Sequence, residues 1–349
     1  MIAGLLIAAA LGVHPHAQTA PPAPPPKFDS GRAWEHLRQL VAIGPRPSGS
    51  TAIEQTRKYI KDTLAADGLA ATEQSWDEQT PVDKVKMTNL IVTIPGARRE
   101  RIVITGHYDT KRIREFRFVG ASDGASSAAF LLELARVLKT RKNPFTYELV
   151  FLDGEEAVCR DWDECARPGA PDNTYGSRHY VTAARHDGTI SAVKAMILID
   201  MIGDRDLDIR RDANSTPWLT DIIWGAAKHQ ELDSYFLDES TRIEDDHLPF
   251  LAAGIPSVDI IDLDYEPWHT AKDNLDAVSA RSLQVVADVI IASLPPIETR
   301  LARQSALAAI RKTGVKKSPR RTVTTYLVAR RHKGLKPQPK PQPPILVGH

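Results

Sequence analysis

The chain alternates between two patterns of apolar positions, and this alternation predicts the class of fold. Apolar residues recur every three or four positions in five stretches, as is typical of amphipathic helices, and these stretches are 31–44, 51–68, 127–140, 218–231 and 281–294. Short runs rich in β-branched residues predict buried strands, and these runs are 88–96, 101–109, 147–156, 192–203 and 257–263. We therefore expect an α/β three-layer sandwich in which helices flank a central mixed, mostly parallel sheet.

The two ends of the chain depart from this pattern. An apolar run over 2–13 is too short to cross a bilayer and is typical of a secretory signal, so we expect a signal peptide over 1–20 and a proline-rich spacer over 21–27. A mis-assigned start or an uncleaved anchor is the alternative. One folded domain is expected over 28–298, and a basic, proline-rich, disordered tail over 299–349. The mature chain would be exported to the periplasm or beyond, with no transmembrane span.

Charge is distributed unevenly along the chain. The formal net charge is +1, but the segment from Arg311 onward holds eleven Lys or Arg and no acid. The first 310 residues therefore carry a net charge of −10. An acidic body argues against nucleic acid as the main partner. The basic tail is either a solvated appendage or a segment that binds an anionic surface.

The chain has two cysteines, Cys159 and Cys165, which lie six residues apart in a polar segment. A metal site built on them would need two more soft ligands nearby, and the sequence offers none. We expect a disulfide that closes a small loop in an oxidising compartment, which agrees with export.

Ligand-type side chains follow several of the predicted strands. They are His107 and Asp109, Glu155 and Glu156, and Asp200 and Asp204. Because ligands of open α/β sheets gather at the carboxyl ends of strands, we expect these side chains to converge on one cleft. So many carboxylates would raise one another's pKa unless a cation neutralised them.

Two further residues complete a metal site. Asp123 lies in a Gly/Ser-rich turn before a helix, and His269 lies in a loop after the last strand. Asp, Glu and His around an open fourth position form a catalytic zinc arrangement. Only one of Glu155 and Glu156 can readily hold the ion, which leaves the other as an acid or base. Taken singly, these residues have simpler explanations, such as a helix cap at Asp123 or turn chemistry at the strand ends; their common position after apolar runs favours the metal.

Eight segments in order resemble the zinc-dependent aminopeptidases of the M28 type and, more closely, the animal-type glutaminyl-peptide cyclotransferases. They span about 28–294 and read "AWEHLRQLVAIGPRPSGS", "GHYDTK", "FVGASDGASSAAFLLELAR", "FLDGEEA", "YGSRHY", "LIDMIGD", "DDHLPFLAAGIPSVDII" and "PWHTAKDNLD". The order of several motifs is more specific than any one of them. The cyclotransferase branch is favoured by "WHT", by the tryptophan shortly after "EEA", and by the doubled acid in "DDHLPF".

This resemblance implies an enzyme that converts the N-terminal glutamine of peptides or proteins to pyroglutamate with release of ammonia. We expect the enzyme to be a monomer. Zinc would polarise the side-chain amide, and the α-amine of the same residue would attack it. The implied roles are zinc binding by Asp123, Glu156 and His269; acid/base catalysis by Glu155, with Asp200 and Asp245 as further catalytic carboxylates; and a substrate pocket formed by Trp268, Trp162 and Phe250.

Two alternatives stay open. In a two-metal aminopeptidase, His107 and Asp200 would hold a second zinc, and Glu155 would deprotonate a water molecule that attacks the first peptide bond. A non-enzymatic, ligand-binding relative is the third hypothesis. The sequence also departs from the animal enzymes at Asp259, which stands where they have a histidine. Asp245 and Asp259 would then form an acid pair that shares a proton.

Overall fold

The computed structural model describes residues 27–313, which contain a six-stranded mixed sheet in the order β1-β2-β4-β3-β5-β8. β3, β4, β5 and β8 run parallel, whereas β2 is antiparallel to both β4 and β1. The expected mixed, mostly parallel sheet is thereby confirmed. The strands are β1 (Ala71–Gln79), β2 (Lys84–Ile94), β3 (Arg98–His107), β4 (Phe145–Leu152), β5 (Val193–Asp200) and β8 (Ser257–Ile261), and a separate parallel pair is β6 (Ile209–Asp212) with β7 (Phe236–Thr241).

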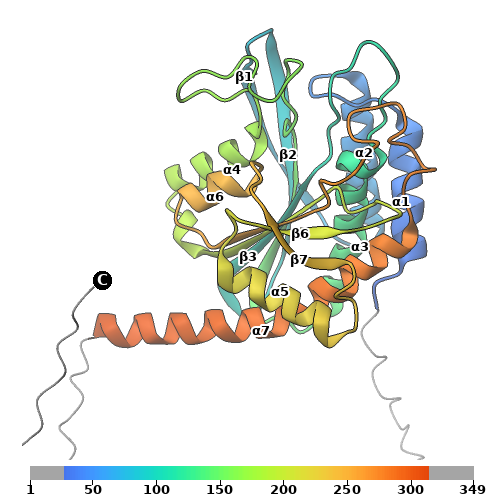
Figure 1. The fold of residues 1–349 in the computed structure, drawn as a ribbon. Coiled ribbons are helices and arrows are strands. Elements are labelled where there is room, and N and C mark those ends of the chain that lie inside the picture. Colours follow the sequence, from blue (N-terminus) through green and yellow to red (C-terminus); the bar gives the residue numbers. More distant parts are fainter. Residues whose placement is uncertain (1–26, 314–349) are drawn as a thin grey trace, which may run out of the picture. The chain divides into compact units, whose positions relative to one another are not determined.

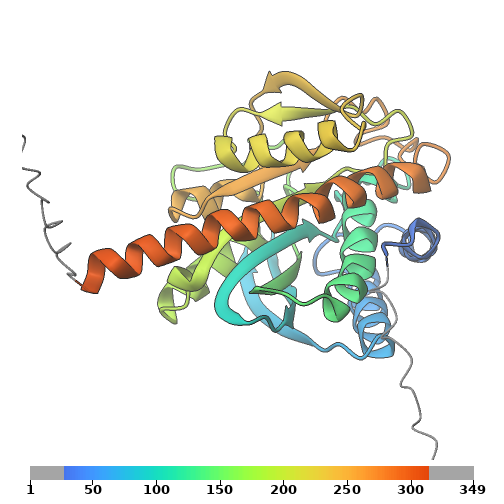
Figure 2. The ribbon, with the colours of Figure 1, turned by 90° about the horizontal axis from the view of Figure 1, so that it is seen from below.

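Helices cover both faces of the sheet, as the three-layer prediction requires. Figure 1 shows α1, α2 and α3 on one side and α4 and α6 on the other. In Figure 2, α5 lies along α7. The two helices are in contact where the guanidinium of Arg300 on α7 lies 4.6 Å from the ring centre of Trp218 on α5. The helices are α1 (Ser30–Ile43), α2 (Thr51–Ala66), α3 (Ser127–Thr140), α4 (Tyr175–His186), α5 (Pro217–His229), α6 (His247–Ala252) and α7 (Ala280–Thr313).

The pleat of the central strands divides the core in two. In β3, Ile102 and Ile104 pack into the larger cluster with α1, α3, α5 and α7, while Val103 between them packs into the smaller cluster with α4 and α6. Successive side chains of a strand point to opposite faces. A strand buried on both faces therefore has a continuous apolar run, which is the pattern that predicted β3, β4 and β5.

Helix α7 continues past the predicted end of the domain at residue 298. It includes Pro295 and Pro296, and Ile297 and Leu301 remain buried in the larger core cluster. This packing offsets the helical hydrogen bonds that the prolines cannot donate. From Gln304 onward the chain forms a separate unit.

The expected signal peptide, nearly all of the spacer, and the tail from residue 314 lie outside the described residues. The domain boundaries stay predictions. None of the helices within 27–313 has the length and apolar character needed to cross a bilayer.

Candidate zinc site and its cavities

The ligand-type side chains converge at the carboxyl ends of the parallel strands. His107 is the last residue of β3 and Asp200 is the last residue of β5, while Glu155 and Glu156 follow the end of β4. Asp123 lies in the irregular turn η1 (Ala121–Ser126), directly before α3. Their convergence at one edge of the sheet follows from its parallel topology.

Asp123, Glu156 and His269 form one compact group of possible metal ligands. One ligand atom of each lies within 4.8 Å of the others. Nε2 of His269 is 3.3 Å from Oδ2 of Asp123 and 3.4 Å from Oε2 of Glu156. Oδ2 of Asp123 and both carboxylate oxygens of Glu156 are buried and accept no hydrogen bond in the described part of the chain. Unsatisfied buried acceptors are costly, so a cation at this point fits the donor set.

The electrostatics of this group point the same way. Burial and the nearby Asp123 carboxylate raise the pKa of Glu156. Burial alone would lower the pKa of His269, but Glu156 and Asp123 outweigh it and raise that pKa to about 10. The two neighbouring carboxylates therefore favour a positive charge between them, and a divalent ion would supply it.

His107, Asp123 and Asp200 form a second possible metal group. Nε2 of His107 is 3.1 Å from Oδ1 of Asp123 and also 3.1 Å from Oδ1 of Asp200. The imidazole is buried, and neither ring nitrogen has a well-aligned hydrogen bond within residues 27–313. The arrangement that the aminopeptidase hypothesis needs is thus also present, with Asp123 common to both groups.

Glu155 lies beside both groups without belonging to either. Its carboxylate is buried, with Oε2 3.6 Å from Nδ1 of His107. Burial, together with Glu156, Asp245 and Asp200, raises its pKa well above the usual value. A buried carboxyl group with a raised pKa suits acid/base work.

A cavity of about 280 Å³, which we call the site cavity, brings most of the predicted residues together. Its apolar wall includes Met201, Ile243, Ile261 and Leu263. It is lined by Asp123, Glu155, Glu156, Asp200, Asp245, Trp162, Trp268 and His269. Four residues that were expected in this cleft do not line it. His107 is beneath the lining, and Asp109 is buried with Oδ1 3.4 Å from Nδ1 of His107. Asp204 is half-buried in a β-bridge with Val278. Phe250 is fully buried in the smaller core cluster, stacked on Tyr180.

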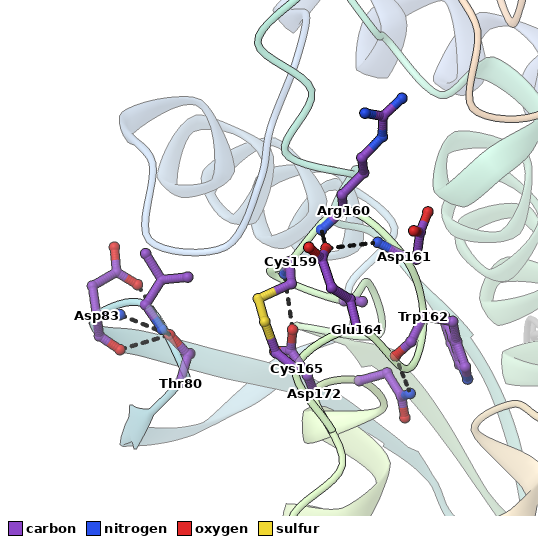
Figure 3. Close-up of a disulfide and its surroundings, with 12 residues drawn as sticks. Thr80, Asp83, Cys159, Arg160, Asp161, Trp162, Glu164, Cys165 and Asp172 are labelled. Atoms are coloured by element: carbon purple, nitrogen blue, oxygen red, sulfur yellow. Dashed lines mark hydrogen bonds between the residues drawn. A yellow bond between two sulfur atoms is a disulfide. The ribbon is translucent and has the colours of Figure 1, made fainter. Parts of the chain in front are cut away.

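The disulfide between Cys159 and Cys165 is present, as predicted. It closes the loop after the two glutamates, and Figure 3 shows Trp162 extending from this loop. The backbone N–H of Cys159 donates to Oδ2 of Asp172 at 2.8 Å, and that of Arg160 donates to Oε2 of Glu164 at the same distance. The loop that carries the pocket tryptophan is therefore fixed both covalently and by hydrogen bonds.

Next to the site cavity, and including Asp245 of its lining, is a group of buried residues that we call the rear cluster, namely Asp245, Asp246, His247 and Asp259. Burial and neighbouring carboxylates raise the pKa of Asp245 and of Asp259 well above the usual range. Nδ1 of His247 is 3.6 Å from Oδ2 of Asp259. The predicted acid pair of Asp245 and Asp259 thus lies in surroundings that favour the protonated form.

The sequence interpretation missed residues that hold the site in place. Asp273 accepts hydrogen bonds from the backbone N–H groups of Ser122 and Asp123, at 2.8 and 3.2 Å, and so fixes the turn that carries the ligand. The fully buried Arg46 donates to the carbonyl of Tyr108, directly after β3, and to those of Val119 and Gly120, directly before the same turn. Arg46 and Asp273 both lie in segments that carried the resemblance. That membership was the only feature of the sequence that could have marked them as residues of the site.

The backbone conformation at the site is also unusual. Gly124 has φ of 87°, and a Cβ there would come within 2.5 Å of the carbonyl oxygen of Asp109. A glycine is therefore required directly after the candidate ligand Asp123. Met201 and His269 have φ of 45° and 52° although neither is glycine, a conformation that side chains disfavour.

Comparison with known proteins agrees with this geometry. The model of peptidase family M28 matches residues 89–294. A glutaminyl-peptide cyclotransferase-like protein of Bos taurus is 31% identical over 301 residues, covering 76% of this chain and 76% of its own. A glutaminyl cyclase structure from an Acidobacteriales bacterium is 39% identical with a TM-score of 0.73, covering 81% of this chain and all of its own. A Bacteroides thetaiotaomicron structure described as a leucine aminopeptidase precursor is 25% identical with a TM-score of 0.70, covering 78% of this chain and 98% of its own. The chain belongs to peptidase family M28.

Proposed function

We propose that the chain is a zinc-dependent glutaminyl-peptide cyclotransferase that acts on the N-termini of peptides or proteins. The observation that carries the proposal is the site cavity, in which a three-residue ligand group, a free buried carboxyl group and two tryptophans face one small space. The more similar relatives, bovine and acidobacterial, are both described as cyclases or cyclase-like proteins.

Asp123, Glu156 and His269 would hold the zinc ion. When bound, the ion would polarise the side-chain amide carbonyl of an N-terminal glutamine. The partly exposed edge of His269, with 24% of its side chain accessible, leaves the ligand group open toward the site cavity. One ion is proposed, with Asp200 left free as a carboxylate.

Glu155 would move the protons. As the α-amine nitrogen attacks the side-chain amide carbon, the carboxylate of Glu155 takes a proton from the amine and returns it to the departing ammonia. The carbon–nitrogen bond of the amide breaks and the ring closes. Asp200 and Asp245, which line the same cavity, would orient the amine. Because both reacting groups belong to one residue, orientation accounts for much of the rate.

The apolar walls favour cyclisation over hydrolysis. Trp162, Trp268, Ile243 and Leu263 surround a space large enough for one side chain of modest size. A glutamine side chain held against these walls keeps its amide carbon beside its own α-amine, so the amine of the substrate is the nearest nucleophile.

A direct test follows two peptides by mass spectrometry, one with N-terminal glutamine and one with N-terminal leucine. We expect the first to lose ammonia with the chain intact and the second to remain unchanged. The Glu155→Gln variant should show neither reaction at a comparable rate. Release of free leucine, with no loss of ammonia from the glutamine peptide, would assign the site to an aminopeptidase.

We also propose that the mature protein is exported. The disulfide supports this proposal, because such bonds persist in oxidising compartments. In unfolded but unreduced protein, a thiol-alkylating reagent should leave both cysteines unlabelled, and a reductant should expose both. The monomeric state stays a prediction.

A further inference from the structure

A larger cavity, of about 410 Å³, adjoins the site cavity. We call it the basic cavity. It lies between residues 111–116 and 158–161, and Val82 closes one side. His269 is part of its wall and also part of the wall of the site cavity. The two spaces therefore share one wall residue, which is a candidate zinc ligand.

The lining of the basic cavity has an excess of positive charge, although the first 310 residues carry a net charge of −10. Two of its cations are engaged. Lys111 donates to the carbonyl of Ala157 at 2.8 Å, and Arg112 pairs with Asp83 at 3.2 Å. The charged lining consists of Lys111, Arg112, Arg114 and Arg160, against the acids Glu115 and Asp161.

Arg114 and Arg160 differ from the other two cations. Both are exposed, and neither guanidinium has a hydrogen bond or ion pair with any other residue of 27–313. The N–H of Arg160 donates to Oε2 of Glu164 within the disulfide loop, and that of Arg114 donates to Oε2 of its exposed neighbour Glu115. Two unpaired guanidinium groups that line the same cavity offer a site for a carboxylate.

The disulfide loop contributes one side chain to the lining of each cavity. It carries Arg160, which lines the basic cavity, and Trp162, which lines the site cavity. Figure 3 shows these two side chains extending from the loop in different directions. A ligand that occupied both cavities would therefore contact two sides of a single fixed element.

We propose that the basic cavity is a subsite for an acidic side chain at the second or third position of the peptide substrate. This inference rests on the proposed function, which places the N-terminal glutamine in the site cavity. The chain would continue past His269, and each extended residue advances by about 3.3 Å with side chains alternating in direction. The second or third side chain would thus reach Arg114 and Arg160.

The test compares acidic peptides with their neutral isosteres. The peptides are Gln-Glu-Ala-Phe-amide beside Gln-Gln-Ala-Phe-amide, and Gln-Ala-Glu-Phe-amide beside Gln-Ala-Gln-Phe-amide. For at least one pair, we expect kcat/KM for ammonia release to be about three- to tenfold higher for the acidic member at low salt. Most of this advantage should disappear at about 0.5 M sodium chloride, where the charges are screened.

Variants assign the preference to the two arginines. The double variant Arg114→Gln/Arg160→Gln should bring the acid-to-amide ratio of kcat/KM close to one. The matched control Arg38→Gln/Arg99→Gln removes the same charge from exposed positions on α1 and at the opposite end of β3, and it should keep the ratio.

The outcomes separate this inference from the proposed function. Cyclisation of the neutral peptides without an acid preference, or a preference that survives Arg114→Gln/Arg160→Gln, overturns the subsite and leaves the cyclase intact. If none of the four peptides is cyclised, the proposed function fails. The dissociation constants of the same peptides, measured by calorimetry, then decide: equal values for acidic and neutral members overturn the subsite as well.

Discussion

The candidate zinc ligands Asp123 and Glu156 and the rear cluster are both buried and rich in acid, yet their surroundings differ. Asp123 and Glu156 face the site cavity beside a histidine and keep unpaired oxygens that an ion could reach. Asp246 and Asp259 are fully buried and line neither of the two cavities. Their pKa values are raised, to about 7 for Asp246. The unpaired oxygens of Asp123 and Glu156 could thus be balanced by a metal ion, whereas Asp246 and Asp259 lie in surroundings that favour the protonated form.

The sharpest test of this comparison is Glu156→Gln. The variant removes a charged ligand, so zinc affinity and activity should each fall by more than about a hundredfold. Zinc content after dialysis, measured by elemental analysis, and the rate of ammonia release report the two effects. The exposed Glu54→Gln serves as control and should behave as wild type. Full zinc content in the Glu156 variant would remove this residue from the ligand set.

Glu155→Gln should have the second largest effect. The side chain keeps its shape but loses its proton-transfer function, so turnover should fall by about a hundredfold while zinc stays bound. The two variants would then lose activity for different reasons: Glu156→Gln through weaker zinc binding, and Glu155→Gln through slower proton transfer. Loss of zinc together with activity would show that Glu155 also holds the ion.

Removal of zinc by a chelator should lower the melting temperature by several degrees, because a bound ion stabilises the folded state. The loss should be larger at pH 8 than at pH 5. Without the ion, the pKa of Glu156 is raised in the folded state, so the folded chain keeps a proton that the unfolded chain releases, and stability falls as pH rises. Scanning fluorimetry at both pH values checks this, and a pH-independent shift would contradict it.

In the rear cluster, Asp259→Asn should be mildly stabilising. Because the pKa of Asp259 is raised in the folded state, the wild type loses stability as pH rises above the unfolded pKa, whereas asparagine does not titrate. We expect a melting temperature higher by about one to four degrees at pH 7 and unchanged near pH 3.5. The exposed Asp238→Asn is the control. A destabilised variant at pH 7 would mean that Asp259 is needed as an anion beside His247.

The parts of the fold and the site that local patterns encode were predictable. The apolar runs of β3, β4 and β5 identified the parallel core, and the acids after each run indicated where a site would form. The proximity of Asp123 and His269 is a tertiary contact that local patterns do not encode. It was nevertheless predicted, because the resemblance implied that both residues bind the same ion. The disulfide followed from the spacing and composition around Cys159 and Cys165.

Other features depend on contacts between distant segments and could not be predicted. The hydrogen bonds of Asp273 to the turn at Asp123 span 150 residues of sequence. Phe250 belongs to a matched motif, but α6 turns it into the core rather than toward the site cavity. Helix α7 continues through two prolines because Ile297 and Leu301 pack against the core, which local propensity does not record.

The left-handed backbone at Met201 and His269 has a consequence for engineering. Each non-glycine residue in this conformation costs on the order of 1–3 kcal/mol, which the surrounding structure must offset. Replacing Met201 by glycine would relieve that cost, but it would also remove a buried side chain from its cluster with Ile243, Ile261 and Tyr265, and truncating a buried methionine costs about 2–5 kcal/mol. The strained backbone directly after Asp200 is therefore retained by packing, and a more heat-resistant variant has to be sought at positions away from the site.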